Sequence, residues 1–228
     1  MTFNPMYLLI IGSALLAWYA QARVRQVHEK YAAVENSRAI SGQDAARALL
    51  AFHKLVDVKV ERTPGLYTDH YDPQANVLRL SDGVANGRSL TALGIVAHEV
   101  GHAIQDAEGY RFMRIRTFLA QRVGTMTQWS SLIFVGGMLF GIPSLMGLGG
   151  LLLAGLAIFS LVTLPVERNA SDRALASLNA AGLAAAEELD PVRQVLGAAA
   201  FTYLAALGQR LATFLFFAVV VAAARGLW

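Results

Sequence analysis

Two histidines four residues apart flank a glutamate in the stretch GIVAHEVGHAIQ, residues 94–105. On a helix this spacing places His98 and His102 on one face, where their imidazoles can share one Zn²⁺ with Glu99 beside them. Zinc in a catalytic site takes three protein ligands and keeps one position for water, which it acidifies. We expect Glu99 to take that water's proton and deliver it to the leaving amine. The motif predicts one catalytic Zn²⁺ per chain; the competing interpretation is two histidines that only bond to backbone carbonyls.

A zinc site of this kind needs a third protein ligand, and three residues are candidates. Glu108 lies six residues after His102, where metzincins place their third ligand, but those proteins need a glycine at the position that Gln105 occupies here. His70 lies in the polar stretch TDHYDP and is the second candidate. Glu167 lies in PVERNASDRAL, directly after a long apolar run, and is the preferred third ligand.

Long uncharged stretches predict that the chain enters a membrane. Of the 228 residues, 55% are hydrophobic and 15% are charged, against roughly 25% charged in soluble domains. No charged side chain occurs in residues 3–20 or between Arg122 and Glu167. Apolar runs of about 18 residues or more are typical of membrane spans. The second run has room for two spans joined at FGIPSLMG, and two crossings return Glu167 to the side of the histidines.

The predicted organisation interleaves membrane segments with the two halves of a catalytic domain. Arg23 and Arg25 follow the first apolar stretch rather than precede it, which favours a retained anchor over a signal peptide, although Ala20-Gln-Ala22 resembles a cleavage site. The predicted segments are an N-terminal transmembrane anchor at 1–22, the first part of a zinc-peptidase domain at 23–124, a transmembrane helical hairpin at 125–166, the second part of the peptidase domain at 167–208, and a C-terminal membrane segment at 209–228.

Local patterns predict a small sheet placed before the helix that carries the histidines. Ser41 and Asp44 stand in capping-box positions at the start of an amphipathic helix. Residues 56–62 alternate as a strand does, and Asn76 to Ser81 form a second predicted strand after an irregular polar connection. Ser89 is the predicted N-cap of the histidine helix.

Arginines gather where the apolar runs end on the side of the predicted site. Positive residues close to membrane ends favour the cytoplasmic side, and the hairpin tip GIPSLMG carries none. We therefore expect a multi-pass cell-membrane protein whose active site faces the cytoplasm. Part of this set also forms a strip expected to face anionic lipid headgroups: Arg111, Arg114, Arg116 and Arg122.

Two stretches together resemble the YugP-type membrane zinc metallopeptidases, distant relatives of the HtpX and CAAX-prenyl endopeptidases. They are LYTDHYDPQANVLRLSDGVANGRSLTALGIVAHEVGHAIQDAEGY and, across the apolar hairpin, LPVERNASDRAL. The resemblance implies a mainly α-helical multi-pass membrane protein, with a gluzincin-like α+β catalytic domain into which the transmembrane hairpin is inserted. It implies zinc ligands His98, His102 and Glu167, with Glu99 as the base.

The same resemblance raises two finer expectations. In the HtpX-like relatives an aspartate four residues after the ligand glutamate supports a zinc histidine, whereas this chain has Ser171 there. In related gluzincins the strand before the active-site helix pairs with extended substrate. The polypeptide substrate is therefore expected along strand 76–81, through an open edge.

The favoured function is a membrane-anchored zinc endopeptidase. A tetrahedral oxyanion needs donors besides zinc, and His70 is the first choice among four polar candidates: His70, Tyr71, Arg173 and Tyr203. One alternative is an intramembrane site-2-type protease, disfavoured by the polar sequence around the motif. The other is a non-catalytic zinc module, disfavoured because structural zinc sites favour cysteine and the chain has none. No nucleic-acid-binding motif is present.

Overall fold

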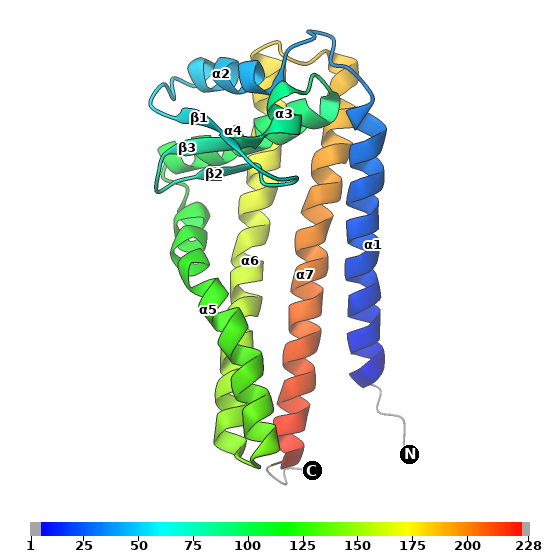
Figure 1. Ribbon diagram of the computed structural model, residues 1–228, viewed down its shortest axis with the longest axis vertical. Coiled ribbons are helices and arrows are strands. Elements are labelled where there is room, and N and C mark those ends of the chain that lie inside the picture. The colour runs from blue at the N-terminus through cyan, green and yellow to red at the C-terminus, as the bar shows by residue number, and fades with distance from the viewer. Residues whose placement is uncertain (1–5, 225–228) are drawn as a thin grey trace. The chain divides into compact units, whose positions relative to one another are not determined.

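The computed structural model describes residues 6–224, most of which lie in helices (Figure 1). The helices are α1 (Met6–Ala32), α2 (Gly42–Phe52), α3 (Asp82–Asn86), α4 (Leu90–Ala107), α5 (Arg111–Leu139), α6 (Pro143–Ala180) and α7 (Leu189–Ala224), with a 3₁₀ turn η1 (Ala186–Glu188) before α7. The strands are β1 (Lys59–Thr63), β2 (His70–Asp72) and β3 (Val77–Ser81).

The described chain divides into two compact units, and each of the long helices α1, α5, α6 and α7 has residues in both. Residues 22–114 and 165–200 form the first, here called the site unit. The described parts of residues 1–21, 115–164 and 201–228 form the second, here called the helical unit. The finer division into five segments stays a prediction.

Within residues 6–224, three helical stretches are long and apolar enough to cross a membrane: Met6–Ala32, Pro143–Ala180 and Ala186–Ala223. The helix α5 is not among them. In the helical unit, α5 and α6 are joined by a turn at Phe140 and Gly141, inside the stretch where the hairpin turn was predicted. A Cβ at Gly149 would lie 2.7 Å from the backbone nitrogen of Phe134, so glycine permits close packing of these two helices.

The helix α6 continues without interruption through Pro165. A proline within a helix removes one N–H and ordinarily kinks or ends it. Here the residues around Pro165 keep a helical backbone. Glu167, which follows the apolar run, therefore lies in α6 itself and not in a separate helix.

The predicted small sheet is present in the site unit, with three strands in the order β1-β3-β2 (Figure 1). The outer strand β1 is parallel to the central strand β3, and the other outer strand, β2, is antiparallel to β3. The expectation that strand 76–81 offers substrate an open edge is therefore wrong, because both of its edges are occupied by neighbouring strands. The strand β2 falls in the stretch expected to be irregular; its three residues are too few to show an alternating pattern.

The core of the site unit forms around α4. The predicted caps are present: Ser89 Oγ accepts from the N–H of Ala92, and Ser41 Oγ accepts from the N–H of Asp44. The buried side of α4 carries Val96 and Val100. It packs in a cluster with side chains of the sheet and the neighbouring helices, among them Leu49, Leu78, Leu80, Val166, Leu178 and Val192. Burial of each large aliphatic side chain contributes about 1.5–3 kcal/mol, which fixes α4 against α6.

Candidate metal centre

The histidine helix turns one partly open face away from this core. Between Thr91 and Val100, the residues of α4 that are not buried are Ile95, His98 and Glu99. They are spaced three, four and one apart, so they share a face of the helix. The motif residues are thus carried on a rigid element whose other faces are held by packing.

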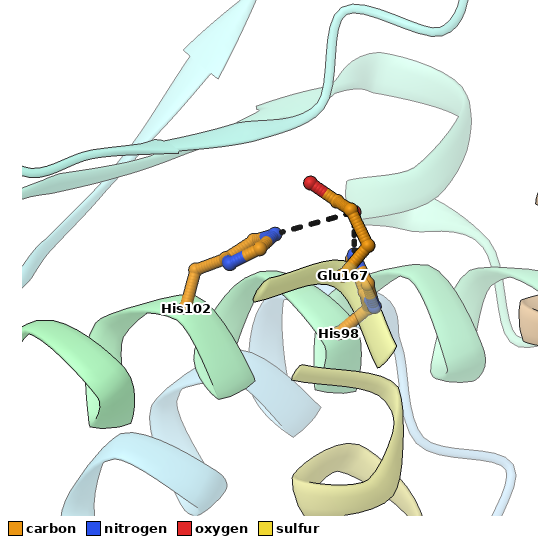
Figure 2. A group of neighbouring side chains, drawn as sticks. All are labelled: His98, His102 and Glu167. Atoms are coloured by element: carbon orange, nitrogen blue, oxygen red, sulfur yellow. Dashed lines mark hydrogen bonds and ion pairs between the residues drawn. The ribbon is translucent and has the colours of Figure 1, made fainter. Parts of the chain in front are cut away.

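Three electron-pair donors converge at this face (Figure 2). His98 Nε2 lies 3.1 Å from Glu167 Oε2, and His102 Nε2 lies 3.7 Å from the same oxygen. One ligand atom from each of the three residues lies within 4.8 Å of the others. Glu167 comes from α6 and is only 2% exposed. Its carboxylate is therefore shielded from water, and it is directed toward the two imidazoles.

The second nitrogen of each imidazole is held by a neutral side chain. His98 Nδ1 lies 3.2 Å from Ser171 Oγ, and that hydroxyl donates to the carbonyl of Glu167, so the imidazole N–H donates to Ser171. His102 Nδ1 lies 3.0 Å from Gln105 Oε1. An amide oxygen only accepts, which makes His102 Nδ1 the donor. Both imidazoles therefore carry their proton on Nδ1 and direct a lone pair from Nε2 toward Glu167.

This donor set fits a zinc ion. Two imidazole lone pairs and one carboxylate oxygen that converge at these distances would be stabilised by a cation between them. Zinc is bound by imidazole nitrogen and carboxylate oxygen, and catalytic sites use three protein ligands of this kind. Imidazole ligands held through Nδ1–H by a second group are also typical of metal sites. The residues that would hold the ion are His98, His102 and Glu167.

Glu99 follows His98 on the partly open face of α4 and is held by the sheet. Its Oε2 accepts the backbone N–H of Tyr71 in β2, at 3.0 Å. The hydroxyl of Tyr71 donates to Asp106 at 2.9 Å and lies 3.0 Å from the amide oxygen of Asn76. Burial and the hydrogen bond to Asp106 raise the pKa of Tyr71, which stays a neutral anchor for β2.

Comparison with known proteins assigns the chain to a family. Residues 6–222 match the family model described as "Putative neutral zinc metallopeptidase". The chain belongs to this family. It is also 42% identical, over 198 residues, to a Bacillus subtilis (strain 168) protein named "Putative membrane protease YugP", a match that covers 87% of this chain and 88% of the relative. No solved structure matches the chain. The predicted resemblance to YugP-type membrane zinc metallopeptidases is confirmed.

The other residues considered for the site do not belong to the cluster of His98, His102 and Glu167. Glu108 ends α4 and pairs with Arg173 at 2.6 Å, a hydrogen bond that holds the pKa of Glu108 below its usual range. Arg173 also donates to Asn169. His70 is exposed on β2; its Nδ1 donates to the carbonyl of Thr68 at 2.7 Å. Its catalytic role stays a prediction.

Two polar residues of the site were missed in the sequence. Gln105 is fully buried, and its Nε2 donates to the carbonyl of Val166 and to Asn169 Oδ1, residues on either side of Glu167. The available signal was its position three residues after His102, on the same side of the helix. Asn169 carries a weaker signal, two residues after Glu167 among charged neighbours.

Proposed function

We propose that this family member is a membrane-anchored zinc endopeptidase of the gluzincin type. The observation that carries the proposal is the convergence of His98, His102 and Glu167, with Glu99 next to His98 on the partly open face of α4. The family description and the name of the Bacillus subtilis relative support peptide-bond hydrolysis at a membrane. The three apolar helices support a multi-pass arrangement.

The roles of the residues follow from their positions. A zinc ion held by the three ligands would supply Lewis acidity toward water and the peptide carbonyl. Glu99, oriented by the N–H of Tyr71, takes the proton of the attacking water and passes it to the leaving nitrogen. Ser171 and Gln105 hold the imidazoles so that their Nε2 lone pairs stay aligned.

The polypeptide substrate is proposed to pair with the edge of β2 instead of β3. Because the N–H of Tyr71 reaches Glu99, it points away from β3. In an antiparallel ladder the carbonyl of the same residue points to the same side. An extended peptide that joins this edge lies against Glu99, and the Tyr71 carbonyl is the backbone group of β2 left to accept its N–H, because the Tyr71 N–H is held by Glu99.

The site-2-type alternative places its metal among membrane helices, and the surroundings here favour the endopeptidase. Asp106, Glu108 and Arg173 lie close to the ligands in sequence or contact, and charged groups of this density are costly at membrane depth. The non-catalytic alternative gives no role to Glu99 on the open face.

We further propose that the site faces the cytoplasm.

Cleavage of casein by the purified full-length protein in detergent tests this function. We expect chelator to abolish cleavage and added Zn²⁺ to restore it. Glu99→Gln should keep the bound metal and the fold while cleavage falls by at least about 100-fold, because the amide cannot take a proton. Glu187→Gln, an exposed glutamate of η1, is the matched control and should cleave as the native protein does. Native-level cleavage by Glu99→Gln would contradict the assignment of the base.

A further inference from the structure

A cavity of about 280 Å³ lies in the site unit beside the first turns of α4. Its walls come from α1, the loop before β2, α3 and α4. The apolar part of the lining consists of Ala32, Leu66, Tyr67, Val84, Ala92 and Ile95. The volume suits one large side chain of a bound peptide rather than a drug-sized ligand, which needs roughly 300–1,000 Å³.

Most polar groups of the lining are already bonded to the protein itself. Asp69 accepts from the N–H and the hydroxyl of Ser81. Ser89 Oγ caps α4 at Ala92, and Thr91 Oγ1 donates to the carbonyl of His28. These groups already have hydrogen-bond partners within the protein, so the cavity offers a ligand mainly apolar contact.

The cavity adjoins Glu99 along two paths. On α4, Ile95 stands four residues before Glu99, and both lie on the partly open face of the helix, about 6 Å apart along its axis. Along the chain, Asp69 lines the cavity and lies two residues before Tyr71, whose N–H donates to Glu99. A peptide in extended form spaces alternate side chains by nearly 7 Å, so a residue near the scissile bond reaches the cavity from the β2 edge.

The mouth of the cavity carries features of a binding site. Leu66 is 81% exposed and Tyr67 66% exposed, an arrangement that leaves two large apolar side chains in water until a ligand covers them. Tyr67 has φ of +58°, in the left-handed region that non-glycine residues rarely adopt. Such backbone strain gathers at ligand sites. The Tyr67 ring lies over His28 at 5.6 Å between centroids.

We propose that this cavity is a substrate subsite that selects a large apolar side chain, leucine or phenylalanine in class, close to the scissile bond. The proposal rests on the proposed peptidase function and names its specificity. Tyr67 and Ile95 form the wall that contacts the selected side chain.

Two variants change the cavity in opposite directions. Gly83 lines the cavity and a Cβ there would meet no atom within 4 Å, so Gly83→Leu adds a large side chain to the lining without a backbone clash. Ile95→Ala enlarges it. The matched controls lie outside the lining: Gly197→Leu, which also has open space for a Cβ, and Ile40→Ala, another partly buried isoleucine of the site unit.

The measurement is the ratio of kcat/KM for leucine against alanine at one position of a peptide, scanned across the cleavage site. The same comparison is made for phenylalanine against leucine. We expect the native protein to prefer leucine at one position by on the order of tenfold or more. Gly83→Leu should reduce this ratio several-fold, and Ile95→Ala should shift the preference toward phenylalanine. Both controls should keep the native ratio. A ratio independent of the cavity variants, or one that the controls change equally, overturns the proposal.

Binding of labelled peptides to the Glu99→Gln protein, followed by fluorescence anisotropy, separates this proposal from the proposed function. If the Glu99→Gln protein prefers leucine in binding and Gly83→Leu removes that preference, the subsite is supported. If the native protein also cleaves nothing, only the peptidase function is contradicted. Cleavage without any side-chain preference in either assay overturns the subsite and leaves the peptidase function standing. Absence of both cleavage and binding overturns both.

Discussion

His102 Nδ1 donates to Gln105 Oε1 at 3.0 Å, and the amide nitrogen of the same glutamine donates to the carbonyl of Val166 and to Asn169 Oδ1. One buried side chain therefore orients His102 on α4 and is hydrogen-bonded to α6 on both sides of Glu167. The relative position of the two helices and the orientation of the imidazole are set by the same residue.

Gln105→Leu is expected to weaken zinc binding by about 10–100-fold while the protein still folds. Leucine has a similar volume, but it leaves His102 Nδ1 and the carbonyl of Val166 without their buried partner. Competition with a chromogenic chelator measures the affinity. The control is Gln74→Leu, because Gln74 is exposed. Unchanged affinity in Gln105→Leu would mean that the imidazole needs no such support.

Gly101→Ala is expected to lower the free energy of unfolding by about 1–3 kcal/mol and to weaken zinc binding, because the added methyl group overpacks the contact of α4 with α6. A Cβ at Gly101 would lie 2.5 Å from the carbonyl oxygen of Ala170, a backbone atom that cannot turn aside. Thermal unfolding in detergent measures the change. Gly197→Ala, where nothing lies within 4 Å, should be neutral or stabilising. Equal thermal stability of the two alanine variants would show that the helices can separate at no cost.

Metal analysis of protein purified without added metal should find one Zn²⁺ per chain. His98→Ala, His102→Ala and Glu167→Gln should each lose most of it, because each removes one of three ligands. Glu108→Gln and His70→Ala, the other residues considered for the third ligand, should retain it. Zinc lost from Glu108→Gln or His70→Ala, and kept by Glu167→Gln, would reassign the third ligand.

The orientation in the membrane is testable because the chain has no native cysteine. Ser144→Cys places a thiol at the start of α6, and Asp82→Cys places one at the start of α3. With the site in the cytoplasm, an impermeant thiol reagent on intact cells should label the cysteine at 144 and spare the one at 82; lysed cells, in which both react, are the control. The reverse pattern would place the active site outside.

The sequence predicted those parts of the site that depend on local spacing. The turn of helix that aligns His98 and His102, and the caps at Ser41 and Ser89, follow from residues within four positions of one another. Glu167 was chosen from its place after the apolar run, and the structure brings it to the histidines. Its role as a ligand awaits the metal analysis.

The remaining features depend on contacts between distant residues. The strand β2 is defined by its pairing with β3 and by the contact of Tyr71 with Glu99, not by a pattern of its own. Its presence occupies the edge of strand 76–81 that substrate was expected to use. Gln105 was weighed only as the residue that replaces a glycine, since nothing local shows that α6 packs above it.

The neutral partners of the two imidazoles determine how much charge the site keeps. Ser171 and Gln105 add no formal charge, so the three ligands together contribute a single negative charge, and a divalent ion bound among them retains one net positive charge. Carboxylate partners would make the imidazoles more basic and quench more of that charge. A zinc ion held by imidazoles with these neutral partners would be the stronger electrophile, and mild chelation should remove it more easily than from a site whose imidazoles donate to carboxylates.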